Sequence, residues 1–328
     1  MEAKEATKEL RSHAGGVLRD IVENIGLVIV GKERVIRNLV LALATGRHVL
    51  VEDVPGVGKT TLIKSLARSL NLSFRRIQFT PDLLPSDITG TSVLDPETSG
   101  FRFRRGPVFH HVILADEINR ASPKTQSSLL ECMEEGQVTV DGVTHHLPKP
   151  FLVMATQNPI EYEGTFPLPE AQLDRFALSL QMGYPDAGEE REMMMRIGNH
   201  SPLESLQSVV DAEQVAGLGE AVESVYASEL IMDYIVAINR ASRYNDDVYL
   251  GASPRASLVM LRLAKALALY EGSDYVLPDH VKEMATPVLR HRLILTPEAR
   301  WENLTTEDVV RDIIRRSTAP GSSEVISP

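Results

Sequence analysis

The sequence lacks the features of several protein classes. Cys132 is the single cysteine among 328 residues, which excludes an intramolecular disulfide and any metal cluster built on cysteines. No apolar run approaches the roughly 20 residues that a membrane-spanning helix needs. Residues 1–16 are charged and lack the apolar stretch of a secretory signal. We therefore expect a soluble, cytoplasmic protein without membrane insertion.

Basic residues are also in the minority. The chain has 34 Lys and Arg against 45 Asp and Glu, and its formal net charge is −11. This balance argues against a general nucleic-acid binder, although a local basic lining is compatible with it. Hydrophobic residues make up 43% of the chain, which is enough for a packed core in one large or two ordinary domains.

One stretch, residues 48–66, reads as a short strand, a glycine loop and a helix, which is the context of a phosphate-binding P-loop. Gly56 and Gly58 have no Cβ atoms, so the backbone can bend around a phosphate. The helix beginning near Lys59 adds unpaired N–H groups and a positive dipole end. Lys59 can reach the β- and γ-phosphates, and the Thr60 hydroxyl can ligate Mg²⁺. The predicted nucleotide-binding residues are Pro55, Gly56, Val57, Gly58, Lys59, Thr60 and Thr61.

Two features near this loop leave alternatives open. The general motif G-x-x-x-x-G-K-[ST] begins with glycine, whereas this chain has Asp53 at that position. An apolar loop, residues 25–31, either covers a nucleotide base with Val30 and Gly31 or serves packing alone, and composition does not distinguish the two.

Two further strand ends carry polar groups. An apolar run ends in Asp116 and Glu117, and another ends before Asn158. Strands of an open α/β sheet deliver ligand-contacting groups at their carboxyl ends. Beside a P-loop, Asp116 can hold Mg²⁺, Glu117 can deprotonate an attacking water, and Asn158 can hold that water by its amide. Taken alone, the acidic pair is usually an exposed strand terminus and Asn158 a turn residue.

Three arginines stand out. Arg255 lies in the first turn of a predicted helix, where the dipole disfavours a cation, so an anionic partner is indicated. Arg175 either pairs with the adjacent Asp174 or enters a neighbouring subunit's site as an arginine finger. Arg120 is the second finger candidate.

The pattern of predicted strands and helices indicates a parallel α/β sheet over residues 1–183, then a helical domain over 184–316 and a loose tail over 317–328. Two hairpins interrupt the first domain, at about residues 86–106 and 137–147. The first contains Arg102, Arg104 and Arg105. These arginines are equally consistent with a solvated hairpin and with a surface that touches a substrate or a subunit. The adjacent pairs His110-His111 and His145-His146 read as structural or surface groups, because neighbours on a strand point to opposite faces.

Together these residues resemble an AAA+ ATPase of the MoxR branch. The resemblance covers nearly the whole chain, and its most specific stretches are residues 50–60, 115–121, 155–159, 168–176 and 253–256. It implies an AAA+ P-loop fold with a parallel sheet flanked by helices and a smaller all-helical lid. It makes Lys59 and Thr60 Walker A, Asp116 and Glu117 Walker B, Asn158 sensor 1, Arg175 the finger and Arg255 sensor 2. Asp53 is similar to what this branch carries, and the hairpins match the family's helix-2 and pre-sensor-1 inserts.

The resemblance also implies ATP and Mg²⁺ as ligands and a homo-oligomeric ring, commonly a hexamer. Its members are implicated as chaperones that mature or activate partner proteins, often ones with a von Willebrand factor A domain. The alternatives are a nucleic-acid-stimulated motor, for which the chain offers only the arginines of the first hairpin, and a nucleotide-gated scaffold without hydrolysis, against which the Asp116-Glu117 pair argues. A small-molecule kinase is disfavoured by the placement of Arg175 and Arg255.

Overall fold

The computed structural model describes residues 2–97, 100–158, 164–196 and 202–321. The chain divides into two compact units: a sheet unit of residues 20–176 and 180–216, and a helical unit of residues 1–19, 177–179 and 217–328. The division falls inside helices α1 (Glu2–Gly26) and α9 (Ala212–Glu223) and strand β9 (Phe176–Leu180). The boundaries at 183/184 and 316/317 stay predictions, and residues 322–328 of the predicted tail lie outside the described ranges.

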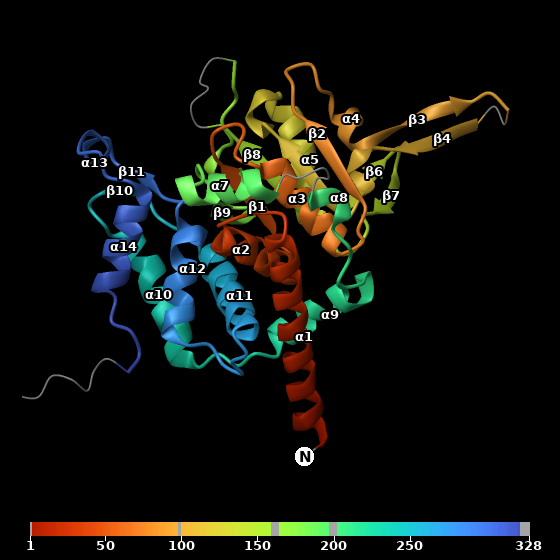
Figure 1. Cartoon of the computed structure of the whole chain (residues 1–328). Coiled ribbons are helices and arrows are strands. Elements are labelled where there is room, and N and C mark those ends of the chain that lie inside the picture. Colours follow the sequence, from red (N-terminus) through yellow and green to blue (C-terminus); the bar gives the residue numbers. More distant parts are fainter. Residues whose placement is uncertain (1, 98–99, 159–163, 197–201, 322–328) are drawn as a thin grey trace, which may run out of the picture. The chain divides into compact units, whose positions relative to one another are not determined.

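A five-stranded sheet organises the sheet unit (Figure 1). Its strand order is β2-β5-β8-β1-β9. Its strands are β1 (His48–Glu52), β2 (Phe74–Gln78), β5 (Val112–Asp116), β8 (Leu152–Gln157) and β9. The pairings of β2 with β5, β5 with β8 and β8 with β1 are parallel. In register, Gln78 lies opposite Asp116 and Val51 opposite Thr156. The carboxyl ends of these strands therefore meet at one edge, as the sequence predicted.

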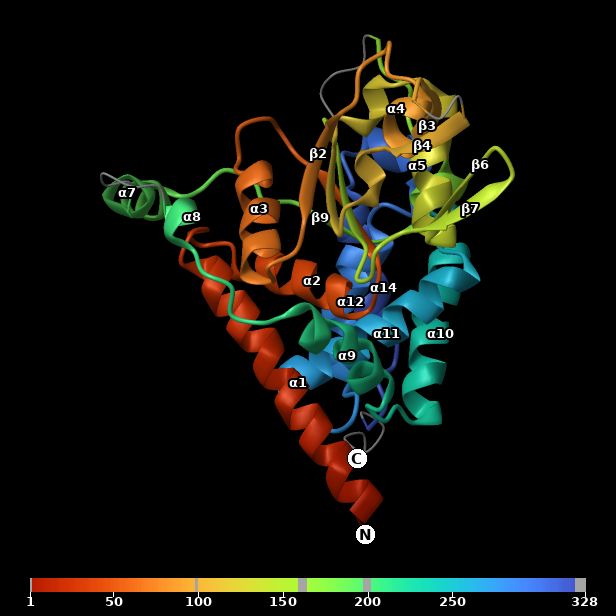
Figure 2. The ribbon, with the colours of Figure 1, turned by 90° about the vertical axis from the view of Figure 1, so that its right-hand side faces the viewer.

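Helices α3 (Lys59–Ser69) and α5 (Pro123–Glu135) lie on opposite faces of the sheet (Figure 2). The right-handed crossover rule explains this, because the connection from β1 to β2 and that from β5 to β8 run in opposite directions across the sheet. Ser122 caps α5 by accepting the Thr125 N–H, and Gly136 ends it in the left-handed conformation. Apolar residues of α5 pack on one face of the sheet in a cluster that includes Leu129, Leu130, Ile113, Val153 and Leu50.

Both predicted hairpins are present. Strands β3 (Gly90–Asp95) and β4 (Gly100–Arg105) form the first, and β6 (Gln137–Val140) and β7 (Val143–His146) form the second around Asp141-Gly142, both with positive φ. Ser92 Oγ donates to Asp141 Oδ2 (2.5 Å), and the Phe103 and His145 rings stack 4.3 Å apart. The hairpins therefore lie side by side (Figures 1 and 2). The short helix α4 (Pro85–Thr89) was not predicted, because five residues show no helical periodicity.

The helical unit contains a bundle of α10 (Glu229–Arg243), α11 (Pro254–Tyr270), α12 (Pro278–Leu289) and α14 (Thr306–Arg316). They confirm the helical character that the sequence predicted for this part of the chain. The unit also holds an antiparallel pair, β10 (Val248–Leu250) and β11 (Ile294–Leu295), which is too short for the sequence to indicate. The remaining elements are α2 (Glu33–Ala44), η1 (Pro107–Phe109), η2 (Ile118–Arg120), α6 (Glu170–Leu173), α7 (Ala187–Arg196), α8 (Pro202–Ser205) and α13 (Pro297–Trp301).

Cys132 and the paired histidines have structural surroundings. Cys132 is buried on α5, and burial raises the pKa of its thiol to about 12, so it is an inert core group. His110 Nδ1 lies 2.9 Å from the Pro107 carbonyl oxygen, and His111 Nδ1 lies 2.8 Å from Ser73 Oγ. Among the described residues, no helix is both long and apolar enough to span a bilayer.

Candidate functional site

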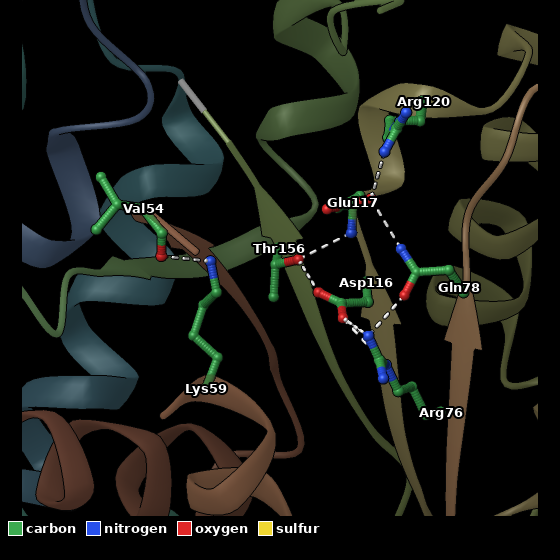
Figure 3. Close-up of polar contacts among 8 residues, drawn as sticks. All are labelled: Val54, Lys59, Arg76, Gln78, Asp116, Glu117, Arg120 and Thr156. Atoms are coloured by element: carbon green, nitrogen blue, oxygen red, sulfur yellow. Dashed lines mark hydrogen bonds and ion pairs between the residues drawn. The ribbon is translucent and has the colours of Figure 1, made fainter. Parts of the chain in front are cut away.

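The glycine loop between β1 and α3 has the backbone shape that phosphate binding needs. Gly56 (φ 87°) and Gly58 (φ 93°) are both in the left-handed region, which residues with a Cβ rarely adopt. Lys59 begins α3 directly after the loop. Its Nζ donates to the carbonyl oxygens of Asp53 (3.0 Å) and Val54 (3.1 Å), the latter shown in Figure 3. The loop therefore presents helical N–H groups and an ammonium group at one place.

A cavity of about 240 Å³ opens over this loop. Its lining combines the loop, the start of α3 and the carboxyl ends of β2, β5 and β8. The lining residues are Pro55, Gly56, Gly58, Lys59, Thr60, Arg76, Asp116, Glu117, Thr156 and Asn158. The structure thus brings together residues that the sequence singled out from three separate stretches.

Asp116 ends β5 and is held from two sides (Figure 3). Its Oδ2 pairs with Arg76, at 2.6 Å from Nη2 and 3.0 Å from Nε. Its Oδ1 accepts the Thr156 hydroxyl at 2.6 Å. The Asp116 side chain is 13% exposed and that of Arg76 is 49% exposed, so the pair lies at the cavity surface. Asp116 lines the cavity, and its carboxylate is a hard oxygen donor of the kind that Mg²⁺ prefers.

Glu117 follows in the left-handed conformation (φ 57°), which is uncommon for a residue with a side chain and is typical of functional sites. Its backbone N–H donates to Thr156 Oγ1 at 2.8 Å. Its Oε2 accepts from Gln78 Nε2 (2.8 Å) and pairs with Arg120 Nη1 (3.1 Å). Gln78 in turn accepts from Arg76, so these side chains form one network beside the cavity (Figure 3).

A second, larger cavity of about 700 Å³ adjoins the glycine loop on its other side. Gly56, Val57, Gly58 and Thr61 form one wall; the rest of the lining is Val28, Ile29, Val30, Lys32, Met182, Tyr184, Pro185, Glu190, Met193 and Met194. A Cβ on Gly31 would lie 1.8 Å from Glu189 Oε1, so a side chain there would have to displace Glu189 of α7, and the φ of 69° also favours glycine. This apolar cavity next to a phosphate loop favours the base-covering interpretation of residues 25–31 over packing alone.

The three arginines have different surroundings. Arg120 pairs with Glu117, as described above. Arg175 follows α6 and pairs with Glu134 of α5 at 3.1 Å. Arg255 is exposed in the first turn of α11, in the helical unit. Arg175 and Arg255 are not among the residues that line the two cavities.

The sequence did not identify Arg76, Gln78 or Thr156. Arg76 and Gln78 are two residues apart on β2, so both side chains point to the same face at the end of the strand. Thr156 lies in one of the stretches that carry the family resemblance, but nothing in its local sequence indicates a contact with Asp116 or Glu117. Polar residues at alternate positions near the carboxyl end of a strand could have indicated Arg76 and Gln78. They could not have indicated that Asp116 and Glu117 are the partners of these side chains.

This donor set fits a nucleoside triphosphate with magnesium. The hard oxygen ligands that Mg²⁺ prefers are available from Thr60 and Asp116. The N–H groups around Gly58, with Lys59, match phosphate oxygens, and the apolar cavity matches a planar base. Glu117 and Asn158 can act on a water molecule between them. The geometry is suited to phosphoryl transfer to water.

Models of known families match both parts of the chain. Residues 48–178 match the ATPase family associated with various cellular activities (AAA), and residues 240–313 match the AAA lid domain. The crystal structure of a presumed ATPase from Cytophaga hutchinsonii superposes with a TM-score of 0.90, at 41% identity, covering 97% of this chain and 99% of that one. Fold and site together define an AAA+ ATPase.

Full-length relatives narrow the class. The chain is 50% identical over 305 residues to the uncharacterized protein YeaC of Bacillus subtilis, covering 93% of this chain and 95% of YeaC. It is 42% identical over 302 residues to Chaperone MoxR1 of Mycobacterium tuberculosis (89% and 80% covered). It is 30% identical over 322 residues to Protein MoxR of Methylorubrum extorquens (90% and 93% covered). The chain belongs to the MoxR family of AAA+ ATPases, and it is an ATP-hydrolysing enzyme.

Proposed function

We propose that this ATPase works in a homo-oligomeric ring and couples ATP hydrolysis to the maturation or activation of partner proteins. The observation that carries the proposal is the convergence of Lys59, Asp116, Glu117 and Asn158 on one cavity over the glycine loop. The name of the relative Chaperone MoxR1 supports the remodelling role. The cytoplasmic location expected from the sequence stays a prediction.

In this proposal each residue at the loop has one task in binding. The N–H groups of residues 56–60 donate hydrogen bonds to the phosphate oxygens, and Lys59 turns from the Asp53 and Val54 carbonyls toward the β- and γ-phosphates. Thr60 and Asp116 hold Mg²⁺, which neutralises phosphate charge when bound. Val30, Val57 and Thr61, which line the adjoining cavity, enclose the adenine. Gly31, which is not part of that lining, shapes the loop beside Val30.

Hydrolysis then needs an oriented water. Asn158 holds a water molecule, and Glu117 takes its proton as the water oxygen bonds to the γ-phosphorus. The bond between that phosphorus and the bridging oxygen breaks, and ADP leaves with the electron pair. Gln78 donates to Glu117 Oε2 and orients the carboxylate. Arg120 pairs with the same oxygen and stabilises its charge, and it would have to leave this pair to act in a neighbouring subunit.

The site is completed by arginines from other parts of the assembly. Arg175 contacts the γ-phosphate of the ATP bound to the neighbouring subunit, and Arg120 is the second candidate for this role. Arg255, from the helical unit, contacts the phosphates. An arginine finger supplied by a neighbouring subunit stabilises charge in the transition state. It accelerates hydrolysis by roughly 10³–10⁵-fold. This division of the site between protomers makes turnover depend on assembly, most simply in a hexamer.

The two hairpins are the parts suited to a client protein. They are tied to each other through Ser92–Asp141 and the Phe103–His145 stack, so they move together. Phe101 is 80% exposed and Val143 is 56% exposed. The expected clients are proteins with a von Willebrand factor A domain, which the family resemblance suggests.

The decisive experiment separates binding from chemistry. Glu117→Gln should bind ATP as the unchanged protein does and release phosphate at least about a hundredfold more slowly, because the amide cannot accept the proton of water. Glu131→Gln, an exposed change on α5, is the matched control and should keep full turnover. Full turnover by Glu117→Gln would refute the role. Stimulation by DNA with steep salt dependence would favour a nucleic-acid motor over a protein remodeller.

A further inference from the structure

Asp53 stands where the general P-loop motif has glycine. Its side chain makes more contacts than a substitution that is merely tolerated would need. Its side chain is buried, with 7% of the residue exposed. Oδ1 accepts the N–H of Val54 at 2.9 Å. Oδ2 accepts the N–H groups of Met182 (2.6 Å) and Gly183 (2.8 Å), which follow β9. One carboxylate therefore satisfies three backbone donors from two segments that are far apart in the sequence.

These two segments both line the larger cavity. Gly56, Val57 and Gly58 line it from the glycine loop, and Met182, Tyr184 and Pro185 line it from the segment after β9. The backbone N–H of Asp53 also donates to the Gln157 carbonyl at 3.3 Å, at the end of β8. Asp53 thus lies where the phosphate loop, the base cavity and the strand end before Asn158 meet.

A glycine at this position cannot make the contacts. Without the carboxylate, the N–H of the buried Met182 loses its acceptor, and an unsatisfied buried donor is costly. An asparagine keeps one oxygen for Met182 and Gly183, but it places an amide group against the N–H of Val54, and two donors repel. Aspartate is the side chain of this length that accepts all three bonds.

We propose that Asp53 is a positioning residue for the nucleoside part of the substrate: its carboxylate clamps the cavity wall of residues 182–185 to the glycine loop, so the two walls lie at the spacing that a purine base requires. This inference rests on the proposed function, since it assumes ATP on the glycine loop. In this inference Asp53, the residue that departs from the motif, selects the base, whereas the glycines and Lys59 hold the phosphates.

The test compares a whole nucleotide with its phosphate part. Titration calorimetry on the full chain measures ATP, CTP and inorganic tripolyphosphate binding to the unchanged protein, Asp53→Gly and Asp53→Asn. Asp53→Gly should weaken ATP binding by about tenfold to a hundredfold, because charge-assisted hydrogen bonds are lost. Tripolyphosphate binding should fall at least about fivefold less, and the preference for ATP over CTP, whose base is the smaller pyrimidine, should narrow. The ATP affinity of Asp53→Asn should lie between those of the unchanged protein and Asp53→Gly. The exposed change Asp20→Asn should leave the affinities unchanged.

Kinetics provide the second readout. The KM for ATP should rise in Asp53→Gly while kcat at saturating ATP stays within about threefold, since lost ground-state binding raises KM alone. Equal losses for ATP and tripolyphosphate, or unchanged ATP binding in Asp53→Gly, would overturn the clamp. If Asp53→Gly does not fold, Asp53→Asn decides by the same comparison. Failure of the unchanged protein to bind ATP, with Lys59→Ala indistinguishable from it, would refute the proposed function instead.

Discussion

Protonation of one buried imidazole should destabilise the sheet unit as the pH falls. His48 begins β1 and is 6% exposed. Its Nδ1 accepts the Val153 N–H at 3.0 Å, so the neutral ring has its proton on Nε2 and donates it to the Met133 carbonyl at 2.9 Å. Desolvation by burial lowers the pKa of His48 from 6.5 to about 4, and the nearby Arg47 charge acts in the same direction.

The sign and size follow from linkage. The pKa is lower in the folded state, so the unfolded chain binds the proton more readily and stability is lost as the pH falls from about 6.5 towards about 4. For these two pKa values, the loss between about pH 7.5 and pH 5 is about 2 kcal/mol, and it approaches about 3 kcal/mol near pH 3. This is a large part of the stability of an ordinary domain, about 5–15 kcal/mol.

Urea unfolding followed by circular dichroism at both pH values measures the effect. His48→Gln removes the titration, so its free energy of unfolding should fall by about 2 kcal/mol less between pH 7.5 and pH 5 than that of the unchanged protein. The exposed His13→Gln is the control and should behave as the unchanged protein does. An identical pH dependence for His48→Gln and the unchanged protein would refute the reasoning.

Two further predictions concern charged pairs. Arg175→Ala should retain ATP binding and lose roughly 10³ in ring-dependent turnover, whereas Glu134→Gln, which removes only the partner of Arg175, should change turnover by less than about fivefold. Phosphate release measured against protein concentration checks this, and a dilute monomer as active as the assembly would contradict it. Arg76→Ala should lower the Mg²⁺ concentration for half-maximal turnover about fivefold, because Asp116 loses a competing cation in a partly exposed pair. Arg75→Ala, on the opposite face of β2, should leave this Mg²⁺ concentration unchanged. An unchanged magnesium titration for Arg76→Ala would contradict the idea that Arg76 and Mg²⁺ compete for Asp116.

Local sequence determined the fold class and the centre of the site. The glycine loop, the Asp116-Glu117 pair and Asn158 could be predicted to converge, because each follows an apolar strand and parallel strands end at the same edge of a sheet. The cap at Ser122 and the turn at Asp141-Gly142 depend on residues only a few positions apart, so local sequence is enough to determine them. Short elements such as α4 escaped because they have too few residues for a periodic pattern.

Only the tertiary structure decided which side chains meet across the chain. It paired Arg175 with Glu134 and placed Arg76 and Gln78 against the acidic pair of the neighbouring strand. It also showed that Asp53, which the sequence marked only as a departure from a motif, binds the backbone 129 and 130 residues further along. Such contacts depend on the packing of strands and loops in space, and no local pattern of residues encodes the partner of a side chain that lies a hundred positions away.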